Sequence, residues 1–194
     1  MKARTVGSDE NWRGSDMERV FVAMGTNWGE RDQNLVAAAA AMEGSFGPAV
    51  LGASLYRSAP VDCEAGAPEF FNTVLAFDTE LPLAKVASLL WTIEAVMGRK
   101  RDRIHEPREI DLDLLLFGSS EVSGPQLTVP HPRMAERGFV LAPLAEMAPD
   151  LYIPHWRSTT KDLWLAWQQS SSGLSCSETV VKIAGSASWF VPRP

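Results

Sequence analysis

Residues 107–117 read Pro-Arg-Glu-Ile-Asp-Leu-Asp-Leu-Leu-Leu-Phe, an alternation of polar and apolar residues that runs into an apolar stretch. This pattern predicts a β-strand. Because successive strand side chains point to opposite faces, one face should carry Ile110, Leu112, Leu114 and Leu116. Asp111 and Asp113 then share the other face, roughly 6–7 Å apart for a rise of about 3.3 Å per residue.

Two interpretations of this carboxylate pair are open from the residues alone. Charged groups on so apolar a strand are costly to bury unless they are paired or bind a cation, so the pair is a candidate site for a hard divalent metal. The preceding segment, 99–108, carries five Lys/Arg against two Asp/Glu, and such groups bind phosphate oxygens. A metal-bound polyphosphate suits both features. Alternatively, the two aspartates form salt bridges with a neighbouring strand or face solvent.

The charge balance favours a small anionic ligand over nucleic acid. The 194 residues carry a formal net charge of −6, with 45% hydrophobic and 22% charged residues, as expected of one soluble domain with some extra length. Segment 99–108 contributes +3, so the remainder carries −9. Nucleic-acid binding requires an extended basic face, which this local positive charge does not provide.

The sequence predicts a cytoplasmic protein. Cys63 and Cys176 form neither a disulfide framework nor a metal-binding spacing, so we expect free thiols in a reducing compartment. No stretch approaches 18 consecutive apolar residues, so we expect no membrane span. Residues 1–19 lack the apolar segment of a secretory signal and are expected to be a poorly ordered polar tail.

The order of expected elements predicts an α+β fold. In chain order we expect a strand at 20–24, a helix at 32–43, strands at 49–58 and 70–79, a helix at 83–97 and the strand at 107–117. This order resembles a ferredoxin-like sandwich, with a mainly antiparallel sheet and helices packed on it. We expect residues 20–154 to form the domain. Residues 155–194 should form a C-terminal extension packed on it, with a helix at 160–169 and a small strand at 179–184.

Four further side chains each have a structural and a functional interpretation. Phe70 and Asn72 share a strand face and could bind a planar ring, although the residues alone favour ordinary sheet packing. Glu94 lies beside the apolar stripe of its helix, where an isolated carboxylate is usually a solvated surface charge. His131 lies between two prolines, where a structural, hydrogen-bonded histidine is more common than a catalytic one.

Seven short motifs, taken together and in order, resemble one family. They are Gly25-Thr26-Asn27, Tyr56-Arg57-Ser58, Phe71-Asn72, Gly98-Arg99-Lys100-Arg101, residues 107–113, residues 127–131 and residues 137–144. Over about residues 20–154 the chain resembles 6-hydroxymethyl-7,8-dihydropterin pyrophosphokinase, an enzyme family of folate biosynthesis. Each motif alone is weak, but their common order is specific.

The resemblance implies transfer of pyrophosphate from ATP to the pterin hydroxymethyl group, with release of AMP. It implies that Asp111 and Asp113 hold two Mg²⁺ ions, and that the phosphates are contacted by catalytic arginines at Arg99, Arg101 and Arg108. The implied ATP-binding residues are Glu94, Arg108, Leu114, Thr128, His131 and Arg137. The implied pterin-binding residues are Ser58, Val61, Phe70, Asn72 and Phe139, with the two phenylalanines stacking on the ring. The expected partners are these small molecules only, for a protein that is a monomer or a homodimer.

Several positions depart from the family pattern. His105-Glu106 stands where Trp-Gly is expected, in a loop one residue shorter than usual. Trp91, Gln126 and Phe70 replace a Gln, an Arg and a Tyr, and the C-terminal extension has no counterpart in the pattern. The loop changes should weaken closure over ATP. They leave open an alternative, a weakly active or inactive member that binds pterin or nucleotide in a regulatory role.

Overall fold

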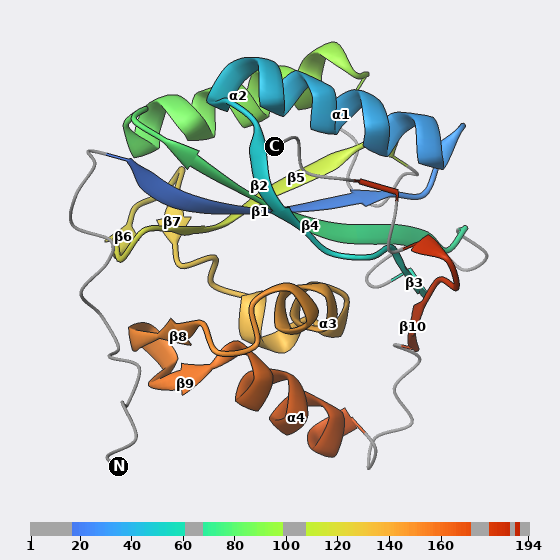
Figure 1. Cartoon of the computed structure of the whole chain (residues 1–194), viewed down its shortest axis with the longest axis vertical. Helices are drawn as coiled ribbons and strands as arrows, with labels where there is room; N and C mark the ends of the chain where they lie inside the picture. Colours follow the sequence, from blue (N-terminus) through green and yellow to red (C-terminus); the bar gives the residue numbers. More distant parts are fainter. Residues whose placement is uncertain (1–16, 61–67, 99–107, 172–178, 187–188, 191–194) are drawn as a thin grey trace, which may run out of the picture.

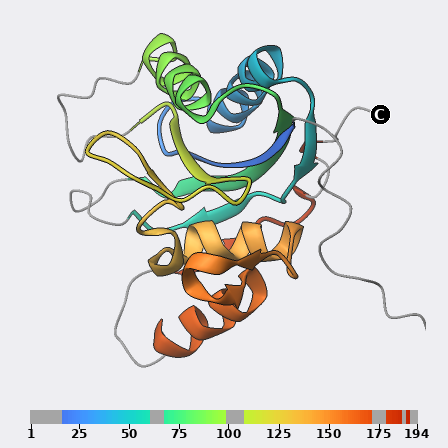
Figure 2. The same cartoon turned by 90° about the vertical axis from the view of Figure 1, so that its left-hand side faces the viewer.

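The computed structural model describes residues 17–60, 68–98, 108–171, 179–186 and 189–190. Figure 1 shows its layers: α1 and α2 cover one face of the central sheet, α3 covers the other, and α4 packs outside α3. Figure 2 shows the same layering after a 90° turn. Of the poorly ordered tail expected at residues 1–19, residues 1–16 lie outside the described residues, whereas Glu18 and Arg19 belong to strand β1, so the expected tail is too long there.

The central sheet is antiparallel throughout. Its strand order is β10-β3-β4-β1-β5, and β2 pairs with β4 off this path. Its strands are β1 (Glu18–Thr26), β2 (Ala49–Gly52), β3 (Tyr56–Ser58), β4 (Phe70–Thr79), β5 (Asp111–Phe117) and β10 (Val180–Lys182). The short strands β6 (Val122–Ser123) and β7 (Thr128–Val129) form one pair, and β8 (Tyr152–Ile153) and β9 (Ser158–Thr159) form another.

The helices are α1 (Arg31–Phe46), α2 (Leu83–Val96), α3 (Gly138–Met147) and α4 (Thr160–Ser171), with single 3₁₀ turns η1 (Met134–Glu136) and η2 (Pro154–Trp156). This arrangement confirms the predicted α+β class with a mainly antiparallel sheet. In the part of the chain that the structure describes, no helix combines the length and apolar character needed to cross a bilayer.

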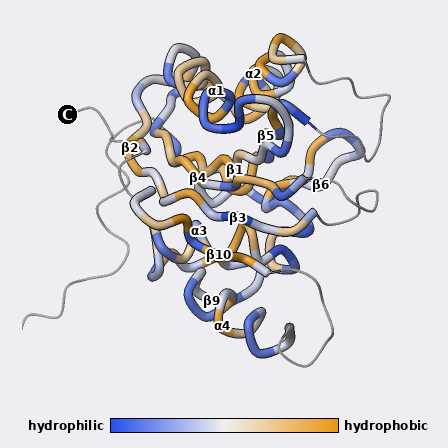
Figure 3. Tube along the Cα trace, turned by 90° about the vertical axis from the view of Figure 1, so that its right-hand side faces the viewer, coloured by the Kyte–Doolittle hydropathy of each residue, from blue (hydrophilic) through white to orange (hydrophobic). Residues whose placement is uncertain are grey.

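Two apolar cores lie on the two faces of the sheet. Val20, Val22 and Met24 of β1 pack with α1 and α2, whereas Phe21 of β1 packs with α3. This split follows from the period-two alternation of a strand that is covered on both sides. Figure 3 shows that hydrophobic stretches concentrate in the central strands and in the helices facing them.

One expectation about strand 107–117 is wrong. Leu116 does not share a face with Leu112 and Leu114, because the register with β1 shifts so that Phe21 pairs with Leu116 and Val22 with Leu114. Leu115 is the extra residue of this β-bulge, and beyond it the alternation reverses. Leu116 therefore lies in the α3-side core, while Leu112 and Leu114 lie in the core under α1 and α2.

The single strand expected at 49–58 is two strands, because the backbone between them bonds to the C-terminal segment. The Leu55 N–H donates to the Ser186 hydroxyl (3.0 Å), and the Leu55 carbonyl accepts from the Ile183 N–H (2.9 Å). The Trp189 indole N–H donates to the Ala53 carbonyl at 2.7 Å. The Ala53 N–H still donates to the Val74 carbonyl of β4 at 3.0 Å, so the bonds to the C-terminal segment take over from the ladder after residue 53.

Candidate active site

The strand register aligns the main candidate residues in one row on the α3 side of the sheet. Asn72 of β4 pairs with Gly25 of β1, and Gly25 pairs with Asp111 of β5. Directly paired residues of neighbouring strands point to the same face, so Asn72 and Asp111 flank a glycine on that face. With strands about 4.8 Å apart, the two functional positions are about 10 Å apart.

Each aspartate of the predicted metal pair is held by an arginine. An Nη1 of Arg108 lies 2.8 Å from Oδ2 of Asp111, and an Nη1 of Arg137 lies 2.9 Å from Oδ2 of Asp113. The two aspartate side chains are 22% and 31% exposed, so they line an accessible surface instead of a closed core. The salt-bridge interpretation is thus correct in part, although the arginines come from the start of the strand and from the start of α3.

Glu94 is buried, and its interpretation as a solvated surface charge is wrong. Its side chain is 1% exposed, and its Oε1 accepts the Leu112 backbone N–H at 2.8 Å. Leu112 lies between the two aspartates on β5, the last strand in the sheet order. Glu94 therefore fixes the strand that presents the carboxylate pair, from the opposite side of the sheet.

Asn27 is a site residue whose individual role the sequence did not reveal. Its Oδ1 accepts the Arg108 N–H at 2.8 Å, and its own N–H donates to the Arg108 carbonyl at 3.1 Å. Its Nδ2 also donates to the Pro68 carbonyl at 3.3 Å. Asn27 thus fixes the backbone of Arg108 directly before the aspartate strand. An Asn that follows a buried strand is a common turn residue, and this signal alone does not single it out.

Two of the residues predicted to bind the pterin, Asn72 and Ser58, form a buried hydrogen-bonded pair. Nδ2 of Asn72 donates to Oγ of Ser58 at 3.0 Å, and both residues are at most 4% exposed. A Cβ added at Gly25 would lie 3.2 Å from Oδ1 of Asn72 and 3.7 Å from Cδ1 of Phe70. Gly25 therefore adds no side chain to the sheet surface between the Asn72 amide and Asp111. Phe70 and Phe139 are half-buried, and Val61 lies outside the described residues.

His131 reaches the carboxylate pair from the segment after β7. Its backbone N–H donates to the Leu115 carbonyl (2.9 Å), and its Nδ1 accepts the Arg133 N–H (3.3 Å). Its Nε2 lies 3.9 Å from Oδ2 of Asp113. Burial lowers the pKa of the imidazole below its usual range; the charges of Arg137 and Arg133 act in the same direction and Asp113 opposes them. The lowered pKa favours the neutral imidazole. The bond that Nδ1 accepts from the Arg133 N–H leaves Nε2 as the position for its proton.

The remaining predicted residues are placed as follows. The Arg137 guanidinium lies 5.6 Å from the ring centroid of Phe139, so these two residues meet at the start of α3. Thr128 is partly exposed on β7. The Leu114 side chain lies in the core under α1 and α2, so any contact that it makes on the aspartate face comes from its main chain. Arg99 and Arg101 lie outside the described residues.

The Asp111 and Asp113 carboxylates suit a cation that is coordinated partly by the protein and partly by a bound substrate. Across the described residues, no group of three or more His, Cys, Asp or Glu side chains could enclose a metal ion. Mg²⁺ usually takes one or two carboxylates and completes its shell with water and substrate phosphates. The Asp111–Asp113 pair, with arginines beside it, fits this mode of binding.

Comparison with known proteins relates most of the chain to one family. Residues 21–149 match the family model described as 7,8-dihydro-6-hydroxymethylpterin-pyrophosphokinase (HPPK). The chain is 42% identical over 142 residues to the 2-amino-4-hydroxy-6-hydroxymethyldihydropteridine pyrophosphokinase of Pseudomonas aeruginosa, covering 73% of this chain and 87% of the relative. It is 40% identical over 128 residues to the Bacillus subtilis protein of the same name, covering 66% of this chain and 76% of the relative.

Some similar proteins are longer. The crystal structure of an HPPK-DHPS protein in complex with substrates matches with a TM-score of 0.65 at 13% identity, over 81% of this chain and 44% of that chain. This chain thus spans less than half the length of that bifunctional protein, and the likeness supports the fold alone. The mitochondrial folate synthesis bifunctional protein of Arabidopsis thaliana is 33% identical over 162 residues, covering 80% of this chain and 29% of the relative.

Proposed function

Because the chain belongs to the 7,8-dihydro-6-hydroxymethylpterin-pyrophosphokinase family, we propose that it transfers pyrophosphate from ATP to 6-hydroxymethyl-7,8-dihydropterin and releases AMP. The observation that carries the proposal is the row Asn72–Gly25–Asp111 across three strands. This row brings the Asn72 amide and the Asp111 carboxylate to one face, about 10 Å apart, which supports roles in ring recognition and metal binding. That spacing lets a flat heterocycle lie over the glycine with its hydroxymethyl group towards the carboxylates.

Asp111 and Asp113 would hold two Mg²⁺ ions. The bound ions supply charge neutralisation for the phosphates and lower the pKa of the attacking hydroxyl. The pair presents one oxygen of each carboxylate to Arg108 and Arg137, within 2.9 Å. The guanidinium groups of Arg108 and Arg137, which lie beside the carboxylates, would bind phosphate oxygens, for which their forked geometry is well suited.

The nucleotide would bind along the edge formed by β7, the following turn and the start of α3. Neutral His131 can donate its Nε2 proton to a phosphate oxygen without adding a charge. Arg137 and Thr128 lie on the same edge. Glu94 supports the neighbouring strand β5, through the Leu112 amide. Arg99 and Arg101 remain sequence-based predictions for further phosphate contacts.

The pterin would stack between Phe70 and Phe139, and Asn72 would read its amide edge. Offset stacking on aromatic rings favours a flat heterocycle. An amide both donates and accepts, so it matches the adjacent donor and acceptor groups of a pterin. Ser58 fixes the orientation of the Asn72 amide by accepting its Nδ2 proton at 3.0 Å. Val61 is the remaining predicted contact.

We also infer that the protein works in the cytoplasm as a monomer or a homodimer on these small molecules. The presence of only two cysteines, without the spacing of a disulfide framework, supports a reducing compartment.

The direct test is a stoichiometric assay of wild-type protein with Mg²⁺, ATP and the hydroxymethyl pterin. We expect AMP and a pterin pyrophosphate in equal amounts, and no AMP when the pterin is left out. Absence of AMP at high protein concentration contradicts the proposal. If calorimetry then shows pterin or nucleotide binding without turnover, the alternative of a regulatory family member is supported instead.

A further inference from the structure

Trp167, on the C-terminal helix α4, lies against the main chain on both sides of Arg137. Its indole Nε1–H donates to the Glu136 carbonyl at 3.1 Å. A Cβ added at Gly138 would lie 2.4 Å from two carbons of the indole ring and 2.8 Å from a third. The ring therefore occupies the space that a side chain at position 138 would fill.

The glycine at 138 is required by space and not by backbone conformation. Its φ lies outside the left-handed region, so any residue could adopt this backbone conformation. Gly138 is the first residue of α3 and is buried. The indole therefore leaves no room for a side chain at position 138.

The contact bears on the reaction because Arg137 and Phe139 flank Gly138. Arg137 binds Asp113 at 2.9 Å and lies 5.6 Å from the centroid of Phe139. On the helix side, the Val140 and Leu141 N–H groups both donate to the Arg137 carbonyl. On the other side, the Glu136–Gly138 segment rests on Trp167. The backbone of Arg137 is therefore held between the first turn of α3 and the indole.

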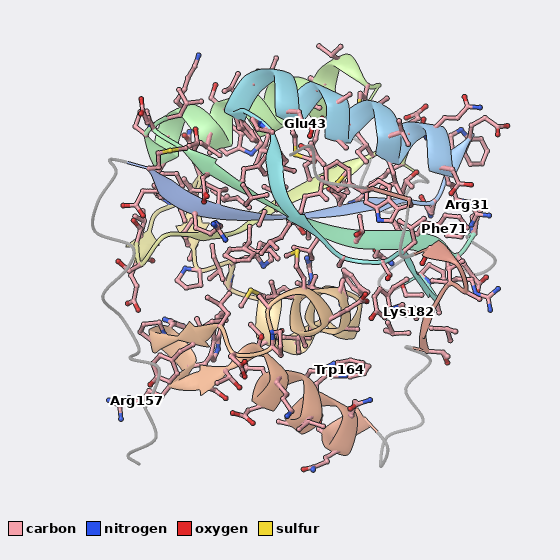
Figure 4. The ribbon with its side chains drawn as sticks, viewed as in Figure 1. Arg31, Glu43, Phe71, Arg157, Trp164 and Lys182 are labelled. Atoms are coloured by element: carbon pink, nitrogen blue, oxygen red, sulfur yellow. The ribbon has the colours of Figure 1, made fainter. Side chains whose placement is uncertain are left out.

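A second tryptophan supports this arrangement. Trp164, one turn earlier on α4, stacks on Trp167 with ring centroids 5.2 Å apart and planes inclined by 11°. Figure 4 labels Trp164 on the helix that packs outside α3. Both tryptophans lie beyond the residues 21–149 that match the family model. This stacking restricts the orientations available to the Trp167 ring and so holds it against the Glu136–Gly138 main chain.

We propose that Trp167 is a positioning residue, which sets Arg137 and Phe139 against Asp113 and thereby aligns the nucleotide with the pterin. The inference rests on the proposed function, in which Arg137 contacts the nucleotide. Trp167 touches neither substrate and acts only through the Glu136–Gly138 main chain. A displacement of about 1 Å at a positioned catalytic group can reduce a rate about 100-fold, so such a support can matter to turnover.

The test is a double-mutant cycle between positions 138 and 167. Gly138→Ala should push the indole away, and Trp167→Ala should remove it; we expect each change to raise KM for ATP about 10-fold. In the double variant the added methyl group fits the vacated space, so its KM should be no worse than that of Trp167→Ala alone. Leu165→Ala, an exposed change on the same helix, is the matched control and should match wild type.

A second cycle separates positioning from simple support of the fold. If Trp167 acts through Arg137, then Trp167→Ala should change KM for ATP little in an Arg137→Ala background. Assays run well below the melting temperature of the least stable variant remove any loss due to unfolding. Additive losses in this background, or wild-type KM values for Gly138→Ala and Trp167→Ala, overturn the inference.

Measuring nucleotide affinity tests the role of Trp167 without requiring that the protein turn over its substrates. Calorimetry with Mg²⁺ and a non-hydrolysable ATP analogue should show the same pattern as KM across both cycles. If wild type forms no AMP, the proposed function fails, and the affinity cycles still decide the role of Trp167. If wild type forms AMP but Trp167→Ala behaves like Leu165→Ala, the inference fails and the proposed function stands.

Discussion

Replacement of Glu94 by alanine should destabilise the protein strongly, although the residue lies on a helix that faces away from the aspartates. The change deletes the carboxylate that accepts the Leu112 N–H at 2.8 Å in a site that is 1% exposed. A typical intramolecular hydrogen bond contributes about 0.5–1.5 kcal/mol, and a buried donor left without a partner costs about 1–3 kcal/mol. We therefore expect a loss of about 2–4 kcal/mol, or a fall in melting temperature of about 5–15 °C for a chain of this size.

The assay is urea unfolding followed by tryptophan fluorescence and circular dichroism. Glu94→Gln keeps an acceptor oxygen of the same shape and should lose less than half as much. Glu80→Ala removes an exposed carboxylate just before the same helix and should change stability by no more than about 0.5 kcal/mol. The reasoning is refuted if Glu94→Ala unfolds at the same urea concentration as Glu80→Ala.

Three further predictions test other parts of the structure. Asn72→Ala removes the amide that donates to Ser58 and should raise KM for the pterin about 10-fold while KM for ATP stays near wild type, as steady-state kinetics with each substrate varied would show. Gly25→Ala places a methyl group 3.2 Å from the Asn72 amide oxygen, where the pterin ring should lie. It should therefore weaken pterin binding, measured by calorimetry, on the order of 10-fold. Unchanged affinity would mean that the ring does not lie over Gly25. For Glu146, partial burial alone would raise the pKa, but hydrogen bonds from Tyr56, Lys182 and Ser54 bring it below its ordinary value of 4.5. A carboxyl group whose pKa is lowered by folding stabilises the folded state at pH values above its ordinary pKa, and this stabilisation is lost as the pH falls. The difference in melting temperature between wild type and Glu146→Gln should therefore shrink as the pH falls below about 4.5. A constant difference from pH 6 to pH 3 would contradict this prediction.

Local patterns in the sequence were sufficient for the long central elements. The strand predicted at 70–79 has those bounds as β4, because its alternation is not interrupted by glycine or proline. The stripe of α2 and its flanking Pro82 and Gly98 likewise predicted a helix at 83–97, one residue longer than observed. The alternation also placed Asp111 and Asp113 on one face, since the bulge comes after them at Leu115.

What the sequence did not reveal depends on contacts between distant segments. The break at residues 53–55 arises from Ser186 and Ile183, more than 120 positions away. The burial of Glu94 depends on which backbone amide of β5 it meets, and Asn27 gains its role only where Arg108 returns to it. Likewise, no local signal shows that the indole of Trp167 occupies the place of a side chain at Gly138.

The most direct test of the central claim is the Mg²⁺-dependent rate of AMP formation by Asp111→Asn and Asp113→Asn. Asparagine keeps the shape of each side chain but removes the charge that would hold the cation. The control is Asp150→Asn, an exposed aspartate after α3. A cation that stabilises transferring phosphates contributes several kcal/mol, so each site variant should lose at least about 100-fold in kcat while the control keeps the wild-type rate. If both site variants form AMP at close to the wild-type rate, the carboxylate pair does not carry the reaction.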